Sequence, residues 1–256
     1  MRPFLRLLGS VILVFVLGAP AHLDAQPGNR AARHFQGDIA RMLAREKTNP
    51  PPQAGILFIG SSIFRFWTEL NQQMAPLPVF NHAFGGSLTQ DILDWTDELV
   101  LPYKPRIIAY YCGSNDVSTG ESADAILDRT KQFLKIINEK LPNTYVYYTA
   151  IQKAPEKQDR WDVVDAVNRE MQRYSKQAKN VGFVDLNPVL FDRQGRVREE
   201  LFLPDGLHFR PDSSAYLEFS QIMKPILAKA WESGVGLSGD LPATSPSTRR
   251  AGPPGP

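Results

Sequence analysis

The residues able to do chemistry fall into four short polar clusters, and the first contains two adjacent serines. Residues 60–63 read Gly-Ser-Ser-Ile and follow directly on an apolar run. A serine at such a strand-to-helix turn projects its hydroxyl where the free backbone N–H groups of the helix start can face an anion. Ser62 is therefore a candidate nucleophile, although serine at this position is also a very common helix cap.

Two further clusters could stabilise negative charge. Residues 81–87 read Asn-His-Ala-Phe-Gly-Gly-Ser, and paired glycines let the backbone approach a substrate and aim an N–H group at it. Residues 113–116 read Gly-Ser-Asn-Asp and follow another apolar run, so Asn115 could direct its amide into the same crevice. Each pattern alone is also typical of an ordinary turn.

The fourth cluster pairs a carboxylate with a histidine. Asp205 precedes His208 by three residues, and on a turn it can accept the imidazole Nδ1 proton while Nε2 faces a serine hydroxyl. Such pairs also occur as loop salt bridges. Beyond the N-terminal segment the other histidines are His82 and His34, the latter on a predicted outer helix. His208 is thus the natural general base.

Together, the four clusters resemble the successive blocks of GDSL-like, or SGNH, hydrolases, in that family's order and with similar spacing over residues 55–227. The resemblance implies Ser62 as nucleophile, with Ser61 standing where the family usually carries aspartate. It also implies a Ser-His-Asp triad completed by His208 and Asp205, and an oxyanion hole of Ser62, Gly86 and Asn115. The spacing is similar to that of the branch containing platelet-activating-factor acetylhydrolase catalytic subunits.

The function implied is a serine hydrolase that cleaves carboxylic esters through an acyl-enzyme. Short-acyl or acetyl esters, of glycans or lysophospholipids, are the expected substrates, and no metal or organic cofactor is expected. Arg65 and Trp67 follow the nucleophile turn and are candidate substrate-binding residues. Asp116 and Asp185 lie near strand ends without a matching histidine cluster, so we expect ordinary capping there rather than a metal site.

Two other functions remain open. An O-acyltransferase acting on cell-envelope polysaccharide would use the same serine, histidine and aspartate and differ only in its acceptor. A non-catalytic glycan- or lipid-binding module on the same scaffold is the second, and the presence of every catalytic residue type argues against it. Action on long acyl chains is disfavoured because no extra apolar lid segment is visible.

The elements that must position these clusters alternate along the chain. Short apolar runs predict five strands, at residues 56–59, 78–80, 106–112, 144–149 and 181–184. Helix-type periodicity fills the intervals, including one helix over 92–99, and a leading helix is expected at 31–46. The pattern predicts a doubly wound, three-layer α/β/α sandwich around a five-stranded parallel sheet. The family resemblance implies the flavodoxin-like form of that fold.

The whole chain indicates one exported domain. Its 256 residues suffice for a single core, and a net charge of +2 gives no electrostatic reason to expect nucleic acid as a partner. Arg2 and Arg6 precede an apolar run at residues 7–17, which predicts a signal peptide at 1–25 and a periplasmic or secreted protein. That run is too short for a permanent span, so no membrane span is expected in the mature chain. The hydrolase domain is expected at 30–233 and a disordered tail at 234–256; the oligomeric state is not predicted.

Overall fold

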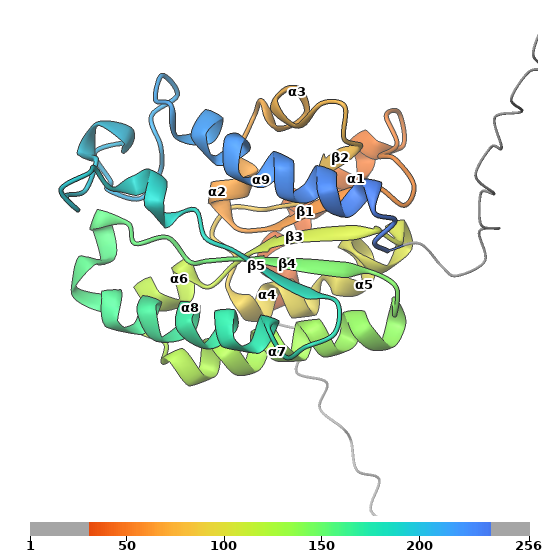
Figure 1. The fold of residues 1–256 in the computed structure, drawn as a ribbon. Coiled ribbons are helices and arrows are strands. Elements are labelled where there is room, and N and C mark those ends of the chain that lie inside the picture. Colours follow the sequence, from red (N-terminus) through yellow and green to blue (C-terminus); the bar gives the residue numbers. More distant parts are fainter. Residues whose placement is uncertain (1–30, 237–256) are drawn as a thin grey trace, which may run out of the picture.

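The computed structural model describes residues 31–236. A five-stranded sheet in the order β2-β1-β3-β4-β5 lies between two layers of helices (Figure 1). Each neighbouring pair of strands is parallel. The strands are β1 (Ile56–Gly60), β2 (Val79–Asn81), β3 (Ile107–Tyr111), β4 (Tyr145–Thr149) and β5 (Val181–Val184). The predicted α/β/α sandwich and its five parallel strands are confirmed.

The strands are central because their side chains are apolar on both faces. Every residue of β1 and of β3 is buried, as expected for parallel strands covered on both sides. The register places Gly60 opposite Tyr111, so β1 and β3 end level with each other. Residues that follow these two strands therefore leave the sheet at the same edge, where open α/β sheets bind their ligands.

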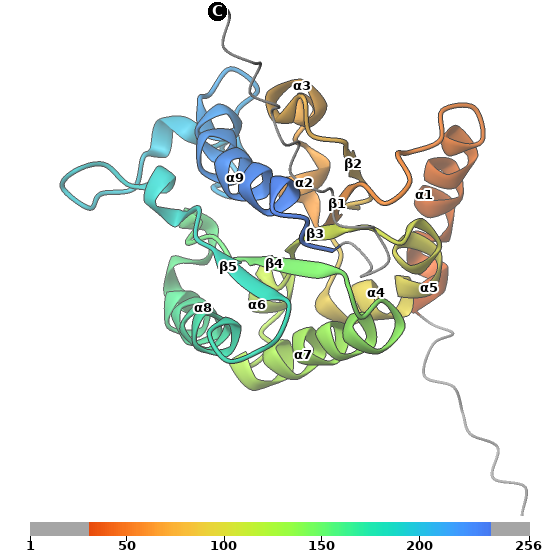
Figure 2. The ribbon, with the colours of Figure 1, turned by 45° about the vertical axis from the view of Figure 1, so that its right-hand side comes forward.

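Two groups of helices cover the faces. One packs on the cluster that contains Leu57, Ile108 and Val146 and comprises α1 (Ala31–Glu46), α4 (Thr89–Asp94), α5 (Thr96–Leu99), α6 (Ser114–Ser118), α7 (Ala123–Lys140) and α8 (Trp161–Ser175). The other packs on the cluster around Phe58 and comprises α2 (Ser62–Arg65), α3 (Leu70–Met74) and α9 (Ala215–Glu232). Figure 2 shows α1 beside the β2 edge of the sheet and α8 on the opposite side of the molecule.

The single helix predicted over residues 92–99 is wrong, because the structure has two short helices there. The break falls at Trp95, which lies between α4 and α5. Next to it, the Thr96 hydroxyl donates a hydrogen bond to the Ile92 carbonyl at 2.7 Å. Such a bond from a threonine to the carbonyl four residues earlier bends a helix, an effect that apolar periodicity does not reveal.

Helix α1 is tied to the sheet by a buried histidine. His82 places Nδ1 2.8 Å from the Leu99 carbonyl and Nε2 2.5 Å from Oε1 of Glu46, the last residue of α1. The Tyr103 hydroxyl donates to the other carboxylate oxygen of Glu46. One ring nitrogen of His82 therefore bonds to α5 and the other to α1. His208 is left as the histidine near the candidate nucleophile.

The predicted signal peptide and the predicted tail beyond residue 236 lie outside the described residues. Residues 234–236 form a turn after α9, and the Arg106 guanidinium donates to the carbonyl oxygens of Trp231 and Val235. Between residues 31 and 236, no helix combines the length and apolar character that crossing a membrane requires.

Candidate active site

Ser62 lies at a sharp turn that only glycine can start. Gly60, the last residue of β1, has φ +138°, and a Cβ there would sit 1.7 Å from the Tyr111 carbonyl oxygen. The chain therefore leaves the sheet abruptly, and α2 begins at Ser62. The Ser61 N–H donates to Tyr111 at 3.0 Å, and the Ser61 carbonyl accepts from the N–H groups of residues 64 and 65. Backbone hydrogen bonds thus hold the turn in which Ser61 replaces the usual aspartate.

The serine contacts the predicted histidine across 146 positions of sequence. Ser62 Oγ lies 2.8 Å from His208 Nε2. On the other side of the ring, His208 Nδ1 lies 2.7 Å from Oδ2 of Asp205. The serine is 6% exposed, whereas the histidine side chain is 22% exposed and the aspartate side chain 47% exposed. The structure thus joins the three residues in one continuous chain of hydrogen bonds.

Asp205 is held as an ionised acceptor. Its Oδ1 accepts the backbone N–H groups of Leu207 at 2.9 Å and His208 at 3.0 Å. Burial alone would raise the pKa of Asp205, but hydrogen bonds from His208 and these two N–H groups outweigh it and lower the pKa below its usual value. The carboxylate is therefore charged at neutral pH and oriented toward Nδ1.

The turn that carries the histidine is anchored by its own backbone. The Leu203 N–H donates to the His208 carbonyl at 2.7 Å, and the Glu156 N–H donates to the Gly206 carbonyl at 3.1 Å. The Gln152 amide donates to the Leu207 carbonyl at 2.9 Å. These contacts fix the imidazole against the segment that follows β4, so the ring is positioned without a ligand.

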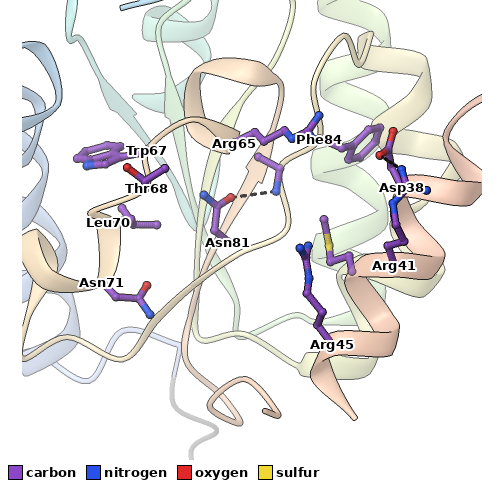
Figure 3. Close-up of a pocket in the computed structure, with 12 residues that line it drawn as sticks. Asp38, Arg41, Arg45, Arg65, Trp67, Thr68, Leu70, Asn71, Asn81 and Phe84 are labelled. Atoms are coloured by element: carbon purple, nitrogen blue, oxygen red, sulfur yellow. Dashed lines mark hydrogen bonds and ion pairs between the residues drawn. The ribbon is translucent and has the colours of Figure 1, made fainter. Parts of the chain in front are cut away.

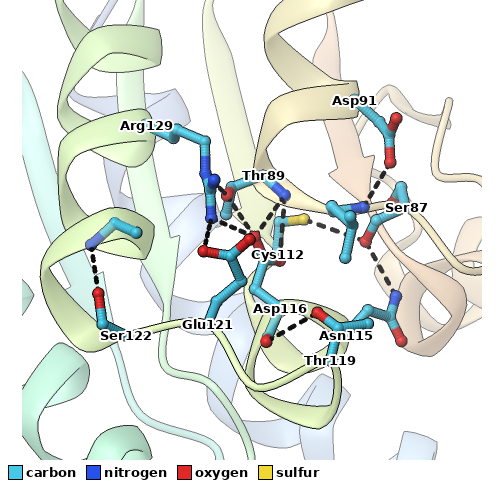
Figure 4. Close-up of polar contacts among 12 residues, drawn as sticks. Ser87, Thr89, Asp91, Cys112, Asn115, Asp116, Thr119, Glu121, Ser122 and Arg129 are labelled. Atoms are coloured by element: carbon cyan, nitrogen blue, oxygen red, sulfur yellow. Dashed lines mark hydrogen bonds and ion pairs between the residues drawn. The ribbon is translucent and has the colours of Figure 1, made fainter. Parts of the chain in front are cut away.

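The predicted oxyanion donors come from the loops after β2 and β3. Gly86 has φ +79°, and Gly86 and Asn115 line one pocket of about 430 Å³. The Asn115 amide donates to the Ser87 carbonyl at 2.9 Å (Figure 4). The Ser87 hydroxyl donates to the Gly60 carbonyl at 3.1 Å. A Cβ built on Gly85 would lie 3.9 Å from the Ser62 Cβ, so this loop passes beside the serine.

The family model for GDSL-like lipases and acylhydrolases matches residues 58–215, the segment that contains Ser62, Gly86, Asn115 and Asp205. The chain belongs to the GDSL-like lipase/acylhydrolase family. It is a carboxylic ester hydrolase, as its membership of that family shows. No curated protein matches the chain.

Solved structures share the fold of this GDSL-like hydrolase at low sequence identity. A Streptococcus pneumonia protein named for platelet activating factor is 20% identical, with a TM-score of 0.66 over 76% of this chain and 94% of its own. A GDSL-like lipase from Bacteroides thetaiotaomicron is 18% identical, with a TM-score of 0.62 over 75% and 98%. A carbohydrate esterase of family 3 from Talaromyces cellulolyticus is 17% identical, with a TM-score of 0.56 over 70% and 98%.

The GDSL-like hydrolase contains a buried network that sequence reasoning missed. The sequence predicts ordinary capping by Asp116; its carboxylate does accept a backbone N–H at a helix start, but the helix is α4, and it also reaches α7 (Figure 4). It accepts the Thr89 N–H at 3.0 Å, the Thr89 hydroxyl at 2.5 Å and the Arg129 guanidinium at 3.1 Å. Burial raises the pKa of Asp116, although the bonds from Thr89 and the charge of Arg129 act to lower it.

This network links the two halves of the predicted oxyanion hole. Asp116 follows Asn115 on α6, whereas Thr89 starts α4 just after the Gly86 loop. The hydrogen bonds from Thr89 to Asp116 therefore tie the segment after Gly86 to the helix that carries Asn115. By contrast, Asp185 has the local role expected of it, since it accepts the backbone N–H of Asn187 at 2.9 Å.

The two candidate substrate-binding residues of the hydrolase differ in their surroundings. Trp67 is 2% exposed, its ring stacks on Tyr216 with 5.4 Å between centroids, and its N–H donates to Gln73 at 2.7 Å. It packs beneath the site, and it also lines the pockets on either side of the α2 turn. Arg65 is exposed, and its Nη1 would lie 3.0 Å from a Cβ on Gly85. Within residues 31–236, no group of three or more acidic, histidine or cysteine side chains is placed to hold a metal ion.

Proposed function

We propose that this hydrolase cleaves its ester through a covalent acyl-enzyme on Ser62, with His208 as general base and Asp205 as the residue that orients the imidazole. The observation that carries the proposal is the unbroken contact from the Ser62 hydroxyl to His208 at 2.8 Å and from His208 to Asp205 at 2.7 Å. Nucleophile, base and orienting acid in this order form the arrangement that activates a serine hydroxyl.

The reaction would run in two halves. Ser62 Oγ attacks the ester carbonyl carbon as its proton passes to His208 Nε2, and the oxyanion that develops faces the N–H groups of Ser62 and Gly86 and the Asn115 amide. His208 then gives the proton to the leaving alcohol, which departs as the acyl-enzyme forms. In the second half, water attacks the acyl carbon as it gives a proton to His208, and His208 returns that proton to Ser62 Oγ as the carboxylic acid departs. No step needs a cofactor.

We propose short-acyl or acetyl esters as substrates, carried by a glycan or a lysophospholipid. With residues 1–25 as an export signal, the enzyme would meet such esters in the periplasm or outside the cell. Acyl transfer to an envelope polysaccharide would proceed through the same acyl-enzyme. Incubation with an acyl donor and a glycan separates the two, because an excess of acylated glycan over free acid would favour transfer.

A pair of serine variants tests the nucleophile. Ser62→Ala should abolish turnover of p-nitrophenyl acetate and covalent labelling by a fluorophosphonate probe. Ser61→Ala removes the neighbouring hydroxyl and is the matched control, which should keep its labelling. Labelling that persists in Ser62→Ala and disappears in Ser61→Ala would move the nucleophile by one residue. A wild-type protein that turns over no ester would instead favour the non-catalytic binding module.

A further inference from the structure

A pocket rich in arginine lies on the α1 side of the nucleophile turn. It has a volume of about 490 Å³ and is enclosed by α1 and by the segment that runs from α2 into α3 (Figure 3). We call it the arginine pocket, and the polar side chains that line it are Asp38, Arg41, Arg45, Arg65, Thr68, Asn71 and Asn81. Three of these side chains are cationic and one is anionic, so the pocket carries excess positive charge.

Within residues 31–236, no ion pair neutralises that excess. Arg41 pairs with Asp38 at 2.5 Å. No carboxylate of residues 31–236 forms an ion pair with Arg45 or with Arg65. Figure 3 shows these two side chains reaching from α1 and from α2 into the space between the helices. Like charges that converge on one space repel each other, and an anion between them removes that repulsion.

Arg45 lies in the last turn of α1, where a cation interacts favourably with the helix dipole, but its spacing from Arg41 is unfavourable. Arg41 and Arg45 lie four residues apart and so share one face of α1, and like charges at this spacing destabilise a helix by a few tenths of a kcal/mol. Guanidinium groups also present paired N–H donors that match the oxygens of phosphate and carboxylate groups. The repulsion between neighbouring arginines and their paired N–H donors both favour an anion as the occupant of this pocket.

The arginine pocket adjoins the nucleophile. Arg65 is the last residue of α2, three residues after Ser62. A Cβ added to Gly85 would lie 3.0 Å from Arg65 Nη1 and 3.9 Å from the Ser62 Cβ, so both side chains adjoin the same point of the loop. A charged group bound there could therefore belong to a molecule whose ester bond lies at Ser62.

We propose that the arginine pocket binds an anionic group, a phosphate or a carboxylate, of the ester substrate. The proposal rests on the proposed function, because the pocket adds a contact to an ester that is already placed at Ser62. Arg45 and Arg65 supply the charge, and Arg41 remains paired with Asp38. The enzyme would then prefer esters with a charged substituent over neutral esters of the same size.

Two matched substrate pairs test this preference. The first compares p-nitrophenyl hemisuccinate with p-nitrophenyl butyrate, which differ in charge on the acyl side. The second compares acetylated glycerol 3-phosphate with acetylated glycerol, which differ in charge on the alcohol side. In at least one pair, the ratio of kcat/KM for the charged ester to that for the neutral ester should fall roughly tenfold in Arg45→Gln and in Arg65→Gln. Arg169→Gln, an exposed arginine on α8 across the molecule, should keep the wild-type ratio.

A binding measurement separates failure of this proposal from failure of the proposed function. Calorimetry with Ser62→Ala should show glycerol 3-phosphate bound and the affinity lost when Arg45→Gln is added. This readout needs no turnover, so it tests the pocket even if no ester is cleaved. Equal ratios in all variants, together with no binding of glycerol 3-phosphate, would overturn the proposal. Binding of inorganic phosphate with no rate advantage for either charged ester would also overturn it, since the pocket would then hold a free ion.

A second pocket, on the histidine side, carries an independent inference. It has a volume of about 690 Å³, and His208 forms part of its wall. The large apolar side chains that are exposed within residues 31–236 all line it: Phe66 at 46%, Leu203 at 36% and Leu217 at 51% exposure. We call it the apolar pocket. Exposed apolar side chains that gather in one place usually mark a binding surface.

The position of His208 decides what this pocket holds. The imidazole that takes the serine proton returns it to the leaving alcohol, so the alcohol portion of an ester departs on the histidine side. The Phe66 ring packs edge to face on the His208 ring, with 5.1 Å between centroids, so the apolar wall extends to the imidazole. The geometry therefore points to an apolar part of the alcohol portion as the occupant of the apolar pocket.

Two pairs of esters, each lengthened on one side of the ester bond, test this assignment. The kcat/KM ratio of hexyl acetate to ethyl acetate should exceed one in the wild type and fall roughly tenfold in Leu217→Asn, because each buried methylene contributes to binding. Leu217→Met keeps the apolar surface and should keep the ratio. The ratio of ethyl hexanoate to ethyl acetate, which varies the acyl side, should respond much less to Leu217→Asn. If Leu217→Asn lowers only the acyl-side ratio, or neither ratio, the apolar pocket does not hold the alcohol.

Discussion

His208 contacts the serine hydroxyl through one ring nitrogen and a carboxylate through the other. An ionised carboxylate can only accept, so Nδ1 carries the proton and Nε2 is left to accept from Ser62. The aspartate is in turn held by two backbone N–H groups of its own turn. The tautomer that a general base needs is therefore set by the Asp-x-x-His turn alone.

Asp205→Asn tests that dependence. The amide no longer acts only as an acceptor, so it can hold the ring in the other tautomer, and kcat on p-nitrophenyl acetate should fall about 10³–10⁴-fold with a small change in KM. Steady-state kinetics measure the effect, and circular dichroism checks that the fold is retained. A loss of less than about tenfold would show that His208 does not rely on this carboxylate.

The lowered pKa of Asp205 has a consequence for stability. A carboxyl group with a lowered pKa in the folded state stabilises the fold above its unfolded pKa, and this contribution is lost as pH falls through the folded pKa. The difference in urea stability between wild type and Asp205→Asn should therefore persist at pH 5 and shrink below about pH 4. A difference that grows on acidification would mean that the carboxyl group prefers its protonated form.

Asn115 donates to the Ser87 carbonyl, so its amide is already oriented before substrate arrives. Asn115→Ala should lower kcat about 10²–10³-fold, the usual effect of losing one oxyanion donor. Ser87→Ala is the comparison variant, because it removes the tether from the Ser87 hydroxyl to the Gly60 carbonyl and leaves the donor in place. Equal losses in the two variants would show that loop position, and not a donor, is what Asn115 provides.

Among the elements, the five strands could be predicted from sequence because each is a short apolar run between polar segments. The division of residues 89–99 into α4 and α5 could not, since it depends on a bond from the Thr96 side chain to a backbone carbonyl. The contacts of Asp116 could not be predicted from the sequence for a related reason. Its partners Thr89 and Arg129 lie on other helices, 27 and 13 positions away, and no local pattern connects them.

Arg129 is the partner whose loss should show most clearly what this network does. Arg129→Met leaves the Asp116 carboxylate buried without its cation, and the free energy of unfolding at pH 7 should fall by about 3 kcal/mol. Because burial already raises the pKa of Asp116, the carboxyl group can escape this cost by taking up a proton at low pH. Urea titrations should therefore find a smaller loss at pH 4 than at pH 7. Adding Asp116→Asn should recover part of the loss, and failure to do so would remove the ion pair as its cause.

At the scale of the whole molecule, three pockets are lined by residues that neighbour Ser62 in the chain or in the candidate site, and each is assembled from parts distant in sequence. The arginine pocket joins α1 to the turn after β1, the oxyanion side joins the loops after β2 and β3, and the apolar pocket joins the end of α2 to α9. The sequence showed Arg65 as a candidate because it follows Ser62, the proposed nucleophile. It could not show Arg45, which reaches the site only because α1 folds back against the sheet.

Glu46→Gln tests whether that docking of α1 matters for substrate choice. The change removes the negative charge that faces His82 at 2.5 Å and also accepts from Tyr103, so the free energy of unfolding should fall by about 2 kcal/mol. Because α1 carries Arg45, a looser α1 should also lower the preference for charged over neutral esters. Lys47→Gln changes an exposed charge one residue away and is the control for charge alone. If Glu46→Gln lowers stability and leaves the preference for charged esters at the wild-type value, α1 contributes to folding but its arginines do not select the substrate.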